Sequence, residues 1–167
     1  MMTIFRLIHA VLGISAIGAG AVVCLRMAAG HLLDEQVAHF LKLSLAASTV
    51  GMILSIGHTS FTQWLALLGV YVSAFAVLSL RNCQSNDGWE TALVMSTMCV
   101  LCLDAVVAMS HAFTLLAVCN VLGTPHQAFP FVVSMVTVVS LFAFLSVQAL
   151  NRIHPQPGAS DIQKVAR

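Results

Sequence analysis

Residues 92–118 read ALVMSTMCVLCLDAVVAMSHAFTLLAV, and this stretch decides the fold. It contains a single charged side chain, Asp104, among residues that are otherwise mostly apolar. A helix needs about 20 apolar residues, each rising about 1.5 Å, to cross the hydrocarbon core of a bilayer. The stretch is long enough to do this, and it therefore predicts a membrane-spanning helix.

The composition of the whole chain agrees with this interpretation. Charged residues make up 8% and hydrophobic residues 59% of the 167 residues, and the mean hydropathy is +0.96. Ordinary soluble domains contain roughly 25% charged residues. The length leaves room for one bundle and no second domain. The formal net charge of +1 argues against a nucleic-acid partner, which would require a basic face.

Five apolar segments are long enough to span a membrane. They comprise residues 4–25, 40–57, 61–80, 92–118 and 130–150. A short polar stretch, His-Thr-Ser at 58–60, separates the second and third segments; one continuous helix there would exceed the bilayer thickness by about a factor of two. We therefore predict an all-α, polytopic transmembrane bundle over residues 1–151, followed by a disordered cytoplasmic tail over residues 152–167.

The basic residues predict the orientation of these spans. With five spans, one side of the membrane holds the N-terminus, the 58–60 turn and the 120–129 loop, and Arg6 is its only Lys or Arg. The opposite side holds the remaining six, which are Arg26, Lys42, Arg81, Arg152, Lys164 and Arg167. Because Lys and Arg accumulate in cytoplasmic loops, we predict an outside N-terminus and a cytoplasmic C-terminus in a cell membrane, most simply a bacterial inner membrane.

A cleaved secretory signal is the alternative interpretation of the N-terminus. Arg6 would form its basic region, residues 7–17 its apolar region, and Ala-Gly-Ala at 19–21 its cleavage site. Cleavage would leave four spans and would place most of the remaining basic residues outside. The positive-inside rule favours the uncleaved chain.

Small residues form one face on each of the first two spans. The first face contains His9, Gly13, Ala16 and Gly20, and the second contains Ser44, Ser48, Gly51, Ser55 and His58. Spacings of three and four residues place each set on one side of a helix. Such seams allow membrane helices to approach closely. Antiparallel packing of the two seams would bring His9 and His58 to a similar depth.

The fourth span adds polar groups to its interior. Thr97, Asp104 and His111 share one helical face, and His111 lies roughly 10 Å further toward the outer side than Asp104. His126 follows in the next loop, on the same side. A carboxyl group inside a bilayer is costly, so Asp104 is a candidate functional residue. Together with Ser55 and Thr97 it forms the predicted set of intramembrane polar groups.

Three kinds of chemistry suit this arrangement. The first is a b-type haem held by two histidines from facing helices. The second is a copper site with thioether, thiol and imidazole ligands. The third is a proton or quinone site that uses Asp104 and a histidine. The candidate haem ligands are His9, His58 and His111, and Met109 and Cys119 join the histidines as candidate copper ligands.

Polar packing is the simpler interpretation of the same residues, and we favour it. A histidine in a membrane helix often only hydrogen-bonds to a neighbouring helix, and Asp104 could be neutral or bonded to Thr97 or to a serine. Cys99 and Cys102 form a C-x-x-C pair within an apolar segment, which is typical of small buried side chains. No metalloprotease, nucleophile-elbow or phosphate-loop motif is present. Catalytic activity is therefore not expected.

Several short motifs resemble those of a family of small uncharacterised bacterial multi-pass membrane proteins, a domain of unknown function. The motifs are His9-x3-Gly13-x2-Ala16-x3-Gly20, Gly30-His31, Tyr71-x-Ser73 and Leu80-Arg81, within about the first 110 residues. Residues 38–41 read Ala-His-Phe-Leu, where the family begins its second helix with His-x2-Gly-Arg. Because the family has no assigned activity, the resemblance implies architecture alone.

We therefore expect a non-catalytic accessory or self-associating component of the membrane. Its partners would be the lipid bilayer and either further copies of itself or other subunits of a membrane complex. A haem-binding or other redox or metal protein that uses the outer histidines is the alternative. A small transporter has less support, because five spans leave little room for an alternating-access pathway unless the chain oligomerises.

Overall fold

The computed structural model describes residues 2–29, 31, 34–54, 61–85, 87–118 and 128–153. All of the regular structure in this part of the chain is α-helical, as the sequence predicts. The helices are α1 (Met2–Ala28), α2 (Asp34–Leu54), α3 (Phe61–Asn82), α4 (Asp87–Val118) and α5 (Ala128–Ile153).

Each of the five helices contains a segment that is long and apolar enough to cross a membrane. These segments are Ile8–Ala28, Glu35–Leu54, Gln63–Asn82, Gly88–Phe113 and Phe131–Arg152. Residues 34–54 and 61–82 form separate helices, α2 and α3, which pack against each other. The prediction of two spans here is confirmed.

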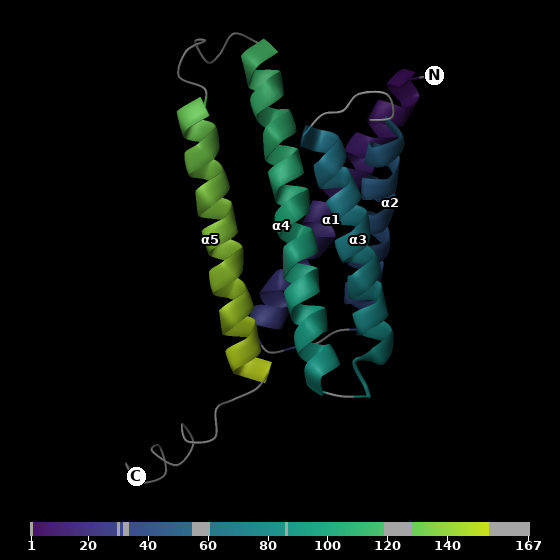
Figure 1. The fold of residues 1–167 in the computed structure, drawn as a ribbon, viewed down its shortest axis with the longest axis vertical. Helices are drawn as coiled ribbons and strands as arrows, with labels where there is room; N and C mark the ends of the chain where they lie inside the picture. Colours follow the sequence, from purple (N-terminus) through teal and green to yellow (C-terminus); the bar gives the residue numbers. More distant parts are fainter. Residues whose placement is uncertain are drawn as a thin grey trace.

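The helices run up and down alongside one another (Figure 1). Helices adjacent in the sequence pack together, most extensively in the pairs α1–α2, α2–α3 and α3–α4. Helix α4 also contacts α1 and α2, so it is in contact with every other helix. Helix α5 contacts only α4 and α1 among the described helices, and it lies at the edge of the bundle (Figure 1).

Two helices begin before the apolar segments that were expected to form them. Helix α2 begins at Asp34 rather than near residue 40, and α4 begins at Asp87 rather than near residue 92. Asp87 and Gly88 are therefore helical. Backbone hydrogen bonding continues a helix past the edge of its apolar segment, and acidic side chains are favourable beside the positive end of the helix dipole.

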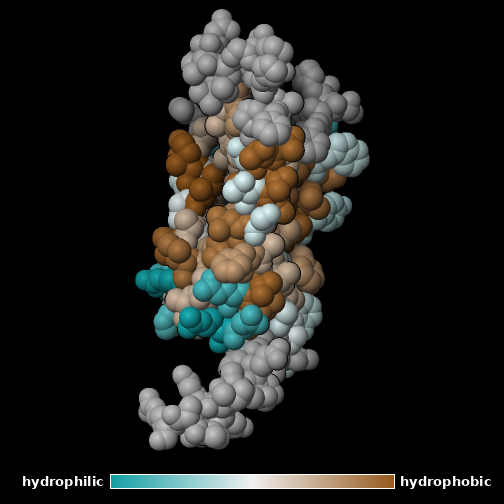
Figure 2. Space-filling model, turned by 90° about the vertical axis from the view of Figure 1, so that its left-hand side faces the viewer, coloured by the Kyte–Doolittle hydropathy of each residue, from teal (hydrophilic) through white to brown (hydrophobic). Residues whose placement is uncertain are grey.

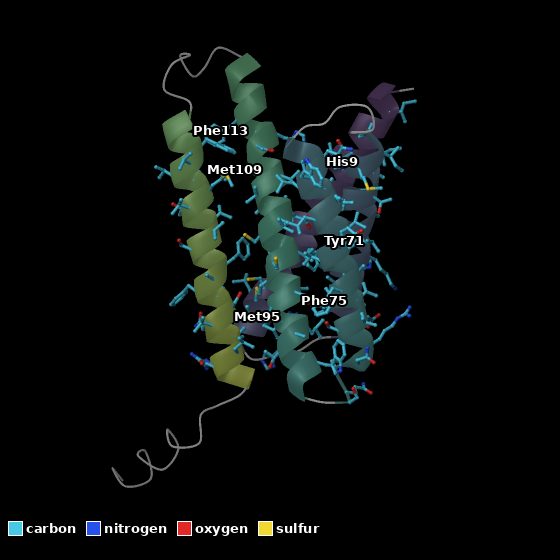
Figure 3. All side chains as sticks on the ribbon, in the orientation of Figure 1. His9, Tyr71, Phe75, Met95, Met109 and Phe113 are labelled. Atoms are coloured by element: carbon cyan, nitrogen blue, oxygen red, sulfur yellow. The ribbon has the colours of Figure 1, made fainter. Side chains whose placement is uncertain are left out.

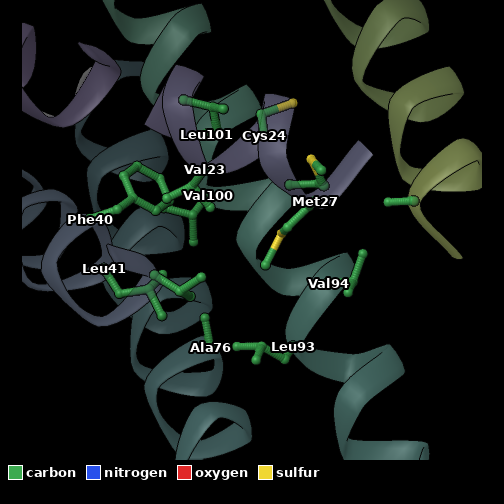
Figure 4. Packing of buried hydrophobic residues seen from close by; sticks show 13 residues of the cluster. Val23, Cys24, Met27, Phe40, Leu41, Ala76, Leu93, Val94, Val100 and Leu101 are labelled. Carbon is green, nitrogen blue, oxygen red and sulfur yellow. The ribbon is translucent and has the colours of Figure 1, made fainter. Parts of the chain in front are cut away.

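The apolar core lies where α1 ends and where α2 and α4 begin. It includes Val23 and Met27 of α1, Phe40 and Leu41 of α2, and Leu93 of α4 (Figure 4). Phe40 and Leu41 are completely buried. This packing fixes the depth of the helices relative to one another, and thereby the positions of the polar side chains above it.

Hydrophilic residues gather at one end of the described surface, and the face above them is largely apolar (Figure 2). The basic residues Arg26, Lys42, Arg81 and Arg152 are all exposed. Arg26, Arg81 and Arg152 lie in the last turns of α1, α3 and α5, which end on the same side of the bundle.

Candidate functional site

Asp104 lies within the span of α4 and is only partly accessible. The Ser44 hydroxyl on α2 lies beside its carboxyl group and is the side chain placed to donate to it. Ser44 Oγ and Asp104 Oδ2 are both buried without a well-formed hydrogen bond to another described residue.

Two further buried hydroxyls in the described bundle also have no hydrogen-bond partner. They belong to Ser73 of α3 and Thr97 of α4. Ser73 is completely buried, and Thr97 is 2% exposed. Buried polar atoms are almost always hydrogen-bonded in native proteins, so each exception requires an explanation. Together with Ser44 Oγ and Asp104 Oδ2, these hydroxyls are the buried side-chain oxygens of the described residues that lack a well-formed hydrogen bond.

His9 is held against α2 by two contacts. Its Nδ1 atom donates a hydrogen bond of 3.1 Å to the carbonyl oxygen of Ala47. Its ring lies against Gly51, where an added Cβ would be 3.0 Å from His9 Cε1. Because Nδ1 carries the proton in this bond, Nε2 of the neutral ring is an acceptor.

His111 of α4 is the second histidine at this end of the bundle. The centroids of its ring and of the His9 ring are 6.1 Å apart, and the ring planes meet at 78°. No group of three or more His, Cys, Asp or Glu side chains gathers around them in the described helices. The structure thus pairs two of the candidate haem ligands, His9 and His111.

Of the other predicted ligands, Met109 is described, and it is not brought to this pair. Figure 3 shows Met109 directed toward α5, on the side of α4 away from His9. The same end of α4 is joined to α5 by Phe113 and Phe131, whose ring centroids are 5.4 Å apart. Four candidates lie outside the described residues, and these are Ser55, His58, Cys119 and His126.

The predicted seam between α1 and α2 forms only at some of its positions. Ala16 is completely buried, and a Cβ added to Gly20 would collide with Leu101 and Phe40. Gly13, by contrast, has open space where a Cβ would be added. Ser48 turns to α3, because a Cβ on Gly69 would lie 2.7 Å from its Oγ. Spacing along a helix identifies a face, but it does not specify which neighbour that face meets.

Sequence reasoning missed the contribution of α3. Ser73 and Ser79 are completely buried, and so is Ala76 between them. A spacing of three residues places all three small side chains on one face, so the signal was present in the sequence. Cys99 and Cys102 are free cysteines; Cys99 is exposed and Cys102 is half-buried, so the interpretation of the pair as small buried side chains is wrong for Cys99.

Comparison with known proteins identifies no relative of this chain. No protein-family model, curated protein or solved structure matches this chain.

Proposed function

We propose that this chain is a multi-pass protein of the bacterial inner membrane that acts as a non-catalytic, self-associating component. The packing of α5 is the observation that carries the proposal. Only 6% of its span is buried within the structure, compared with 44% of the α4 span. Helix α5 therefore presents much of its apolar surface to lipid or to another protein.

The composition of the exposed α5 face supports a second copy as the occupant. Residues exposed along this face are Val132, Val136, Val139, Ala143 and Val147. They follow one another at intervals of three or four residues, so they form a continuous stripe of small or β-branched side chains. Membrane helices associate through van der Waals packing of matching surfaces, and a regular stripe of this kind provides one. Two copies related by a two-fold axis would present the same stripe to each other.

Cysteine crosslinking in native membranes tests self-association. In a cysteine-free background, Val139→Cys places a thiol on the exposed α5 face, and Ala149→Cys places one on its buried face. We expect a thiol-reactive crosslinker to yield a dimer from the Val139→Cys variant and none from the Ala149→Cys variant. A monomer from both, with complete labelling at position 139, would contradict the proposal.

A two-histidine cofactor or metal site is a second candidate, because the structure places His9 and His111 side by side. The bond from His9 Nδ1 to the Ala47 carbonyl resembles the arrangement that orients metal-ligating histidines. His9 Nε2 would then be the ligand atom. Haem b is the cofactor that this pair would suit, and copper is the alternative.

Absorption spectra of the purified protein test this second candidate. Oxidised and dithionite-reduced spectra, together with metal analysis, would be recorded for the wild type, His9→Ala and His111→Ala. A reduced haem spectrum that is lost in both variants would support ligation by this pair. A colourless protein without stoichiometric metal would leave the two rings as packing groups between α1, α2 and α4.

A further inference from the structure

His9 and His111 lie at one end of the bundle, close to the ends of their membrane spans. His9 directly follows Ile8, where the α1 span begins, and His111 lies just before Phe113, where the α4 span ends. Figure 3 shows His9 at the end of the bundle opposite to the basic last turns of α1, α3 and α5. The His9 ring is half-buried and the His111 ring is exposed, so the pair is open to ions from this surface.

The distance between the two rings fits one small ion between them. Their centroids are 6.1 Å apart. A direct N–H···N hydrogen bond of about 2.9 Å would bring the centroids to about 5 Å, because a ring nitrogen lies about 1.1 Å from its ring centre. Two imidazoles that bind one metal ion from opposite sides have centroids about 6 Å apart, since each metal–nitrogen bond is about 2.0 Å. A tetrahedral angle at the metal would shorten this distance to about 5 Å.

The number of ligands selects the kind of ion. Among the described residues, no third His, Cys, Asp or Glu side chain joins the pair, and Met109 is directed toward α5 (Figure 3). Zn²⁺ is almost always bound by four ligands, and Cu²⁺ favours four in a plane. Cu⁺ and Ag⁺, which have a filled d shell and a single charge, accept two ligands in a line. The pair is therefore suited to a monovalent ion of this type.

The backbone of α2 distinguishes a small ion from a haem. An atom at the Cβ position of Gly51 would be 3.6 Å from His9 Nε2, so α2 occupies the space beside this nitrogen. A haem spreads at right angles to the bonds between its iron and the axial histidines, and it would need that space on every side. A single ion needs only the line between the two nitrogens.

We propose that His9 Nε2 and a ring nitrogen of His111 bind one Cu⁺ ion, or Ag⁺ in its place, in a linear site between α1 and α4. The inference rests on the two-histidine site proposed above and assigns its occupant. The bond from His9 Nδ1 to the Ala47 carbonyl orients the ring and leaves Nε2 free to bind the ion. Gly51 is a positioning residue, because the absence of its side chain leaves room for the His9 ring.

Competition with a coloured Cu⁺ chelator tests the site in the full-length protein. A cysteine-free background removes the five thiols, which would bind Cu⁺ themselves. We expect one Cu⁺ per chain. His9→Ala and His111→Ala should each lower the Cu⁺ affinity at least about a hundredfold, and Gly51→Ala should lower it roughly tenfold. His39→Ala removes an exposed histidine of α2; it is the matched control and should leave the affinity unchanged.

Replacement of a ligand separates loss of the site from loss of the fold. A thioether binds soft monovalent ions but is a poor ligand for Zn²⁺. His111→Met should therefore retain the Cu⁺ binding that His111→Ala loses, although both variants lack the same imidazole. X-ray absorption should show two nitrogen neighbours at about 2 Å in the parent protein, and one nitrogen and one sulfur in His111→Met.

The outcomes distinguish this inference from the two-histidine site on which it rests. A haem spectrum that is lost in both alanine variants would support the site and overturn Cu⁺ as its occupant, and so would tighter binding of Zn²⁺ than of Cu⁺ by the same two residues. A Cu⁺ affinity that neither alanine variant lowers, or that His39→Ala lowers equally, would also overturn the inference. Self-association through α5 is tested separately by crosslinking at Val139, and none of these results bears on it.

Discussion

Glycines on the same helix have different packing roles in this protein. A Cβ on Gly20 would collide with Leu101 and would lie 2.7 Å from Phe40 Cε2, whereas one on Gly18 would meet nothing within 4 Å. Leu101 and Phe40 both belong to the buried core, so they have little room to move. The absence of a side chain at Gly20 is therefore what allows α1 to approach α2 and α4.

Gly20→Ala should destabilise the bundle by about 1–3 kcal/mol, the usual cost of overpacking a core. Unfolding in mixed micelles, followed by circular dichroism, would measure the change. Gly18→Ala is the matched control, and it should be neutral or slightly stabilising because alanine favours the helix. Equal effects of the two substitutions would mean that helix propensity, and not contact, governs position 20.

The contact between His9 and Gly51 should appear as coupling between the two residues. Gly51→Ala would push a methyl group against the His9 ring, at 3.0 Å from Cε1. It should cost on the order of 1 kcal/mol in the wild type and less in a His9→Ala background, where the ring is absent. A double-mutant cycle measures this difference. Gly13→Ala, in open space on α1, should show no coupling to His9.

At the scale of single residues, the sequence predicted faces but not partners. His9 was expected at a similar depth to His58, which lies outside the described residues, and its described contacts are the Ala47 carbonyl, Gly51 and His111. Spacing specifies the side of a helix from which a residue projects. The depth and tilt of the neighbouring helix decide what lies opposite, and these depend on core packing that the spacing does not contain.

At the scale of elements, the existence and number of the helices followed from hydropathy, whereas their ends did not. A long apolar segment of a membrane protein forms a helix, because a helix pairs every backbone N–H and C=O group where hydrocarbon offers no partner. Beyond the apolar segment that requirement disappears, and α2 and α4 continue into charged sequence at Asp34 and Asp87. Hydropathy therefore predicts the membrane segment better than it predicts the full helix.

Because α4 is more buried than α5, a substitution that shortens a side chain should destabilise the protein more in α4 than in α5. Val100 of α4 is 1% exposed, whereas Val139 of α5 is 49% exposed. Val100→Ala should cost roughly 1–2 kcal/mol, because it leaves a cavity among packed side chains. Val139→Ala should change the stability of the monomer by less than about 0.5 kcal/mol. Unfolding in mixed micelles at a dilution that keeps the protein monomeric would compare the two variants.

At the scale of the whole molecule, the basic residues predict orientation. Of the described Lys and Arg residues with defined side chains, Arg26, Arg81 and Arg152 lie in the last turns of α1, α3 and α5. The up-and-down arrangement places these three turns at one end (Figure 1). We therefore propose that this end faces the cytoplasm, since Lys and Arg are retained on that side during insertion.

Reporter fusions at the two termini would test this orientation. A fluorescent protein that folds only in the cytoplasm should be bright at the C-terminus, and alkaline phosphatase, which requires export, should be active at the N-terminus behind a spacer.

If charge sets the orientation, replacing Arg26, Lys42 and Arg81 by glutamine while adding lysines at the N-terminus should reverse part of the population. Adding the lysines alone gives the control for the local effect. An unchanged orientation in the combined variant would show that some other feature of the helices determines how the bundle inserts.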